Sequence, residues 1–136
     1  MADADEVRRM MLLAASIFPV MLRCTVMETI PLRGETRDMR MMFADRGLTF
    51  EPALAERLGV SRADGSWDGQ QWNLEATPAA GGTFEAVFMP HDTAEGRFGL
   101  DWRRLGAKKP GAEPAIMSSG IADCRATNMP KEGQSK

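Results

Sequence analysis

The chain has 136 residues, of which 43% are hydrophobic and 26% are charged, and its formal net charge is −2. One domain of this size buries about two-thirds of the surface of its unfolded chain, and the composition is ordinary for a globular protein. Because affinity for nucleic acid comes largely from clustered lysine and arginine, the slightly acidic balance and the scattered arginines disfavour a nucleic-acid partner.

The N-terminal segment, residues 1–19, has two interpretations. Residues 10–22 are an uncharged apolar run, too short to span a bilayer as a helix, which takes about 20 residues. The run has the length of the apolar part of a signal peptide, although the leader MADADE is acidic. The alternative is a core helix over residues 5–18, which Pro19 would end because proline lacks a backbone donor. A signal peptide, a membrane-associated anchor and a packed N-terminal helix therefore all stay open.

From residue 20 onward the hydrophobic period is two, which is typical of β-strands. Residues 20–30 and 36–43 predict a first hairpin, because PLRGE between them is rich in turn formers. Residues 51–58 predict a short helix, with Pro52 in its first turn and Gly59 at its end. The segment SRADGSWDG, residues 61–69, is expected to be a loop, since Asp-Gly pairs favour turns.

Three strands with alternating aromatic residues and one final strand follow this loop. They lie in QQWNLEA, TFEAVFMP, RFGLDWRRL and IMSSGIADCRA. The side chains expected to face the core are those of Leu22, Cys24, Val26, Met39, Met41, Phe43, Leu54, Leu58, Trp72, Leu74, Ala76, Phe84, Ala86, Phe88, Phe98, Leu100 and Trp102.

The predicted fold is mainly β, within the α+β class. It is a small antiparallel sheet, barrel- or sandwich-like, with an N-terminal helix and one short helix near residues 51–58. Residues 20–125 are expected to form a single β-rich domain. The polar residues 126–136 have no hydrophobic period and predict a disordered tail.

The two cysteines, Cys24 and Cys124, fall on the first and last predicted strands. They form either one disulfide or two buried thiols. A disulfide closing about 100 residues would contribute roughly 4–5 kcal/mol in the chain-entropy model. Two cysteines do not complete a zinc site, and no metal is expected. The disulfide and the apolar run together favour an extracytoplasmic location, periplasmic or secreted, with a cytoplasmic location as the alternative.

The segment ALAERLGVSR, residues 53–62, resembles the first helix and turn of a bacterial helix-turn-helix. That motif needs a second helix directly after the turn, which enters the major groove. Here ADGSWDG follows, with two glycines and two aspartates that disfavour a helix beside phosphates. A helix-turn-helix-like nucleic-acid-binding regulator using residues 50–67 is therefore kept only as the alternative function.

The potentially catalytic residues of the sequence do not form a recognised catalytic motif. His91 is the only histidine and lies beside Asp92, and Ser118 and Ser119 have no base nearby in the sequence. Glu75, Glu85 and Asp101 are expected on the outer faces of successive strands, where paired-carboxylate chemistry is geometrically possible. Glycine-rich phosphate loops are absent from the sequence. We expect no enzymatic activity, no catalytic residue and no cofactor.

The eleven methionines suggest an interaction role. In the predicted registers Met27, Met42, Val87 and Met89 point away from the core. An apolar second face on an antiparallel sheet is expected to be covered, either by the N-terminal helix or by a partner. The sequence therefore predicts a small non-enzymatic binding or accessory structural protein, which contacts a protein partner through this face or through the N-terminal segment. Membrane association through residues 10–22 is the other possible contact, and small-molecule binding is left open.

Overall fold

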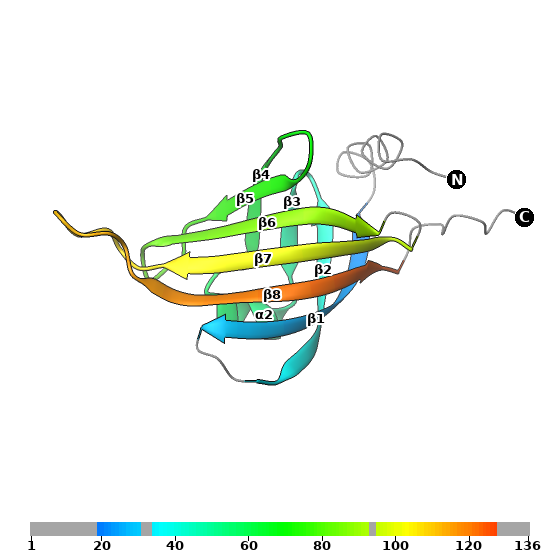
Figure 1. Ribbon diagram of the computed structural model, residues 1–136, viewed down its shortest axis with the longest axis horizontal. Helices are drawn as coiled ribbons and strands as arrows, with labels where there is room; N and C mark the ends of the chain where they lie inside the picture. The colour runs from blue at the N-terminus through cyan, green and yellow to red at the C-terminus, as the bar shows by residue number, and fades with distance from the viewer. Residues whose placement is uncertain (1–18, 31–33, 93–94, 128–136) are drawn as a thin grey trace, which may run out of the picture.

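A computed structural model describes residues 19–30, 34–92 and 95–127. Eight antiparallel strands, each hydrogen-bonded to the next in the chain, form a barrel that closes where the first strand pairs with the last (Figure 1). Closure leaves no unpaired sheet edge. The strands are β1 (Val20–Ile30), β2 (Thr36–Ala44), β3 (Gly47–Phe50), β4 (Arg62–Trp67), β5 (Trp72–Ala76), β6 (Thr83–Asp92), β7 (Arg97–Leu105) and β8 (Ile116–Ala126). The mainly β, barrel-like prediction is confirmed.

The two ends of the barrel differ. At the terminal end, on the right of Figure 1, β1 begins and β8 ends. At the opposite end, here called the helix end, α2 (Pro52–Leu58) connects β3 to β4. Leu54 and Leu58 of α2 are buried, 2% and 1% exposed, so the short predicted helix covers the core at this end. Arg57 of α2 ties the helix to β1, because its Nε donates to Glu28 Oε1 at 2.9 Å.

The barrel interior is filled by the alternating residues that the sequence assigned to the core. Near the terminal end the ring centroid of Phe43 lies 5.0 Å from that of Trp72 and 5.4 Å from that of Phe88. Nearer the helix end, Phe84 lies 5.8 Å from Phe50 and 6.2 Å from Trp102. Such aromatic pairs contribute about 0.5–1.5 kcal/mol beyond the burial of their surface. Of the predicted core residues, Ala76 is only partly buried.

Gly120 of β8 allows Trp102 to lie inside the barrel. The two residues are directly opposite each other in the β7–β8 register, and a Cβ atom at position 120 would lie 2.6 Å from Trp102 Cζ2. Only glycine leaves room for this approach. Trp102 stacks on Phe84 and is 5% exposed, so the missing side chain on β8 contributes directly to the packing of the core.

The loop predicted for residues 61–69 is wrong, because β4 occupies residues 62–67 and pairs with β3 and β5. β3 was not predicted either. Both strands are short, and the Asp-Gly pair in β4 disfavours a strand, but backbone hydrogen bonds to neighbouring strands outweigh that propensity. Ala63 is the buried residue of β4, at 1% exposure.

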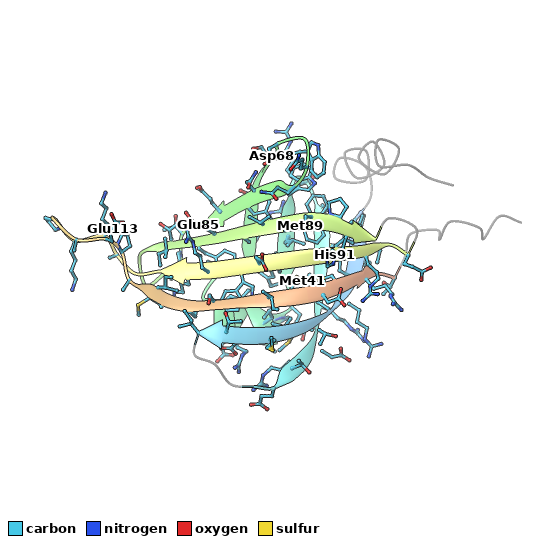
Figure 2. The ribbon with its side chains drawn as sticks, in the orientation of Figure 1. Met41, Asp68, Glu85, Met89, His91 and Glu113 are labelled. Atoms are coloured by element: carbon cyan, nitrogen blue, oxygen red, sulfur yellow. A yellow bond between two sulfur atoms is a disulfide. The ribbon has the colours of Figure 1, made fainter. Side chains whose placement is uncertain are left out.

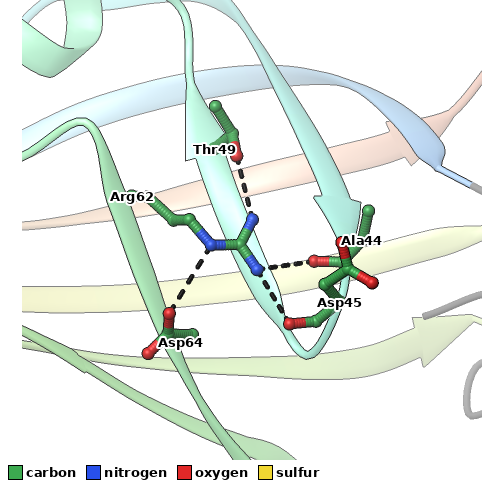
Figure 3. A network of polar contacts seen from close by, with 5 residues as sticks. All are labelled: Ala44, Asp45, Thr49, Arg62 and Asp64. Atoms are coloured by element: carbon green, nitrogen blue, oxygen red, sulfur yellow. Dashed lines mark hydrogen bonds and ion pairs between the residues drawn. The ribbon is translucent and has the colours of Figure 1, made fainter. Parts of the chain in front are cut away.

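Arg62 holds the turn between β2 and β3, as Figure 3 shows. Its Nη2 donates to the carbonyl oxygens of Ala44 and Asp45, each at 2.8 Å, and its Nη1 donates to Thr49 Oγ1 at 3.1 Å. Asp45 and Arg46 have φ of 52° and 64°, the left-handed region that tight hairpin turns require. The guanidinium thus satisfies carbonyl groups of a turn that has no glycine at its two central positions, Asp45 and Arg46.

Two predictions concern segments outside the described residues: the N-terminal helix over 5–18, and the tail beyond residue 127. At the C-terminal boundary, Ala126 still belongs to β8, and the Thr127 amide donates to the Met21 carbonyl at 2.8 Å. Within the described ranges, no helix has the length and apolar character needed to cross a membrane.

Candidate functional site

Of the two alternatives for the cysteines, the structure has the disulfide: Cys24 and Cys124 are bonded across the β1–β8 seam. They are directly opposite each other in the register, with Cα atoms 4.0 Å apart, and each is 1% exposed. The bond joins positions separated by 100 residues in the sequence. It therefore links the first and last strands at the seam where the barrel closes.

The outer face of β1, β8, β7 and β6 carries a hollow that we call the Gly99 hollow. Its volume is about 420 Å³. Gly99 of β7 has no side chain, and a Cβ atom there would lie 3.8 Å from both His91 Nδ1 and Met89 Cγ. Both labelled side chains lie along β6 in Figure 2. The hollow is lined by Thr25, Met27, Thr36, Met89, His91, Gly99, Leu100, Asp101, Ile121, Ala122 and Asp123.

The four predicted interface residues are only partly brought together. Met27 and Met89 line the Gly99 hollow, whereas Val87 lines a neighbouring hollow on β5–β8. Met42 lies elsewhere, on β2, directly opposite Met21. Met42 lines neither hollow, because it lies near the terminal end of β2, whereas Thr36 at the other end of β2 lines the Gly99 hollow.

Ile121 is an interface candidate that the sequence analysis missed. It is 43% exposed, lies directly opposite Met27 in the β1–β8 register, and lines the same hollow. Its position was available from parity, since Ile121 is an odd number of residues from the inward-facing Cys124. Together with Met27 and Met89 it forms the apolar part of the Gly99 hollow.

The residues considered for catalysis are spread over the barrel. His91 lies near the terminal end of β6, whereas Ser118 pairs with Arg104 near the helix end of β8. Ser119 Oγ lies 2.8 Å from Thr29 Oγ1, in a hydrogen bond between the two hydroxyl groups.

Two of the three outer-face carboxylates, those of Glu75 and Glu85, are on directly paired residues of neighbouring strands. Glu75 is directly opposite Glu85 on the outer face, and Glu85 Oε1 accepts from Arg103 Nε at 2.8 Å. Asp101 lies on β7 opposite Val87, which is two residues along β6 from Glu85. Over residues 19–30, 34–92 and 95–127, no three histidine, cysteine or carboxylate groups are placed to hold a metal ion.

Asp68 organises the loop between β4 and β5 at the terminal end. Asn73 Nδ2 donates to its Oδ2 at 2.9 Å, and the amides of Gln70 and Gln71 donate to its Oδ1 at 2.9 and 3.1 Å. The hydrogen bond from Asn73, followed by those from the two amides, lowers the pKa of the Asp68 carboxyl below its usual 3.8. The ionised side chain thus stabilises the loop that follows the unexpected strand.

The helix end has little internal space. The cavity beneath α2 has a volume of about 10 Å³, which is room for one water molecule. By contrast, the Gly99 hollow and the hollow beside Val87 on the outer face measure about 420 and 470 Å³. Among these three spaces, only the two outer hollows are large enough for a group bigger than a water molecule.

The resemblance to a helix-turn-helix ends after the first helix, in agreement with the sequence ADGSWDG, which disfavours a second one. The resembling segment begins with α2, but its second half forms β4 rather than a helix that could enter a major groove. Comparison of the chain with protein-family models, with curated proteins and with solved structures finds no match.

Proposed function

We propose that this protein is a non-enzymatic, extracytoplasmic binding or accessory structural protein that contacts a protein partner through the Gly99 hollow. The observation that carries the proposal is the position of Met27, Met89 and Ile121 around one hollow on the outside of a barrel with a packed interior. Residues on the solvent side of an antiparallel sheet are ordinarily polar. Apolar side chains at this place are best explained by a surface that becomes covered.

The chemistry of the hollow suits a protein partner. Methionine is flexible and polarisable, so it adapts to the side chains of a partner. Asp101 and Asp123 line the same hollow and would supply polar groups of the kind that surround the apolar centre of an interface. The fitting partner presents apolar side chains flanked by hydrogen-bond donors or basic groups.

The proposed location follows from the disulfide. Disulfides persist in oxidising compartments and are rare where thiols are kept reduced. The Cys24–Cys124 bond is buried at the closing seam of the barrel and therefore serves a structural purpose. Measuring the cysteine redox state and the N-terminal sequence of the protein in fractions of its host cell tests this location.

Site-specific photo-crosslinking of the full chain tests the interface. A photoreactive residue at Ile121 is expected to give one discrete crosslinked product, and Met27→Asp with Met89→Asp should abolish it. The matched control is the same photoreactive residue at Asp64, which is exposed on β4, four strands around the barrel from β8. Identical product patterns from positions 121 and 64 would contradict the proposal.

A further inference from the structure

Four arginines form a row across the outer face of the barrel, on β2, β1, β8 and β7. Arg23 is directly opposite Arg40 on one side and Arg125 on the other, and Arg125 is opposite Arg97. The residues that flank them along each strand are buried, so the four side chains point outward. Neighbouring strands are about 4.8 Å apart, so the row extends over roughly 14 Å. We call these residues the arginine row.

Only half of the arginine row is neutralised by the ion pairs found in the described residues. Arg23 Nη2 lies 3.0 Å from Asp38 Oδ2, and Arg97 Nη2 lies 2.7 Å from Asp123 Oδ2. Arg40 and Arg125 form no ion pair with the described part of the chain. Like charges directly opposite each other destabilise a sheet, so the row would gain from an anion supplied by a binding partner.

The row is held in place by the closing seam. Arg23 precedes Cys24 and Arg125 follows Cys124, so the disulfide fixes the strand positions next to this arginine pair. A hollow of about 410 Å³ lies among Arg23, Arg97 and Arg125. The charges are therefore presented on a preorganised surface rather than on a loop.

An apolar pair borders the row on the side of the terminal end. Met21 and Met42 are opposite each other, each two residues along its strand from an arginine of the row. Met21 is 40% exposed. β1 begins at the same end, and its first three residues, 20–22, are the last three of the apolar run of residues 10–22. Exposed apolar side chains beside basic ones are the combination by which proteins bind at the surface of an anionic bilayer.

We propose that the arginine row and the Met21–Met42 pair bind the surface of an anionic phospholipid membrane. The row curves around the outside of the barrel, and its span matches several separate headgroups better than one small ion, which would reach only two neighbouring arginines. Guanidinium groups pair with phosphate in bidentate geometry. The hollow among the arginines adjoins the Gly99 hollow and shares Thr25 and Asp123 with it, but none of the four arginines lines the Gly99 hollow.

Vesicle co-sedimentation of the full chain tests this proposal. The probes are vesicles of equal parts phosphatidylglycerol and phosphatidylcholine, and vesicles of phosphatidylcholine alone, which measure any contribution of the apolar N-terminal run. Arg40→Gln with Arg125→Gln removes the two charges of the row that form no ion pair with the described residues. Lys108→Gln with Lys109→Gln is the matched control, because it removes the same charge from the exposed β7–β8 connection at the helix end.

Stronger partitioning of the unaltered protein to the anionic vesicles, diminishing at high salt, is expected. Each arginine near such a surface contributes about a fivefold change in partitioning, so the double arginine variant should bind about 25-fold more weakly. The lysine variant should stay within about twofold of the unaltered protein. Near-UV circular dichroism and the thermal midpoint confirm that both variants fold.

Three results would overturn the proposal. Equal partitioning to the two kinds of vesicle, or an equal loss in both double variants, would show that the arginine row has no particular role in lipid binding. Displacement from anionic vesicles by inorganic phosphate at constant ionic strength would show that the row binds a free oxyanion instead of a membrane surface.

Discussion

Removing the Cys24–Cys124 bond should cost a large part of the stability of the barrel. The bond closes a loop of 100 residues, which in the chain-entropy model restricts the unfolded chain by about 4.7 kcal/mol. Small domains are stable by only about 5–15 kcal/mol. In the double variant Cys24→Ala, Cys124→Ala the backbone pairing of β1 with β8 remains, so the barrel should still form with a much smaller free energy of unfolding.

Urea denaturation of the oxidised protein and of this double variant measures the difference. The expected loss is about 4–5 kcal/mol, or roughly 15–20 °C in thermal midpoint for a domain of this size. The slope of the free energy with urea should rise, because the unfolded chain without the bond exposes more surface. As a control, a reducing agent should destabilise the unaltered protein and leave the double variant unchanged. A loss below about 1 kcal/mol with an unchanged slope would refute the reasoning.

Three further predictions concern the helix end, the Arg62 turn and the Asp68 loop. Leu54→Ala should lower the free energy of unfolding by about 2–5 kcal/mol, since this side chain of α2 is 2% exposed. The control Glu56→Ala, on the exposed side of the helix, should change the free energy of unfolding by less than about 0.5 kcal/mol. Equal losses for the two variants in urea denaturation would contradict the role of α2 in covering the core. Arg62→Ala should lower the free energy of unfolding by about 1–2 kcal/mol, because hydrogen bonds from a partly exposed guanidinium to two turn carbonyls are lost. Unchanged amide hydrogen exchange in the β2–β3 turn would contradict this expectation. The Asp68 carboxyl should titrate below 3.8 in an NMR pH series, so its stabilisation of the loop is complete above pH 3.8 and is lost as the pH falls through the lowered pKa. The Gln70 amide signal should follow the same titration, and a midpoint at or above 3.8 would exclude the observed hydrogen bonding.

The strands that the sequence predicted well are those with a strong alternation of large side chains. Trp72 and Leu74 of β5, and Phe84 and Phe88 of β6, face the core as expected. Such a pattern predicts a strand because successive side chains point to opposite faces of a sheet. The pattern is weak where residues are small or acidic, and for that reason β4 was taken for a loop.

For the candidate interface, the sequence predicted the direction of individual side chains but not which of them lie close together. That Met27 and Met89 point outward was predictable from alternation within each strand. That they line one hollow was not, because they lie on β1 and β6 and come near each other only through β8 and β7. Met42 also points outward, and yet it lies near the terminal end of β2, away from the hollow.

The sequence by itself determined which face of most strands is buried, the short helix, and the inward position of both cysteines. These properties depend on the geometry of neighbouring residues along one chain segment. The tertiary structure alone decided that β1 pairs with β8, and this pairing placed Cys24 opposite Cys124 and Arg23 opposite Arg125. Pairing between distant strands depends on backbone hydrogen bonds and on the closure of long loops. No local pattern in the chain records these interactions.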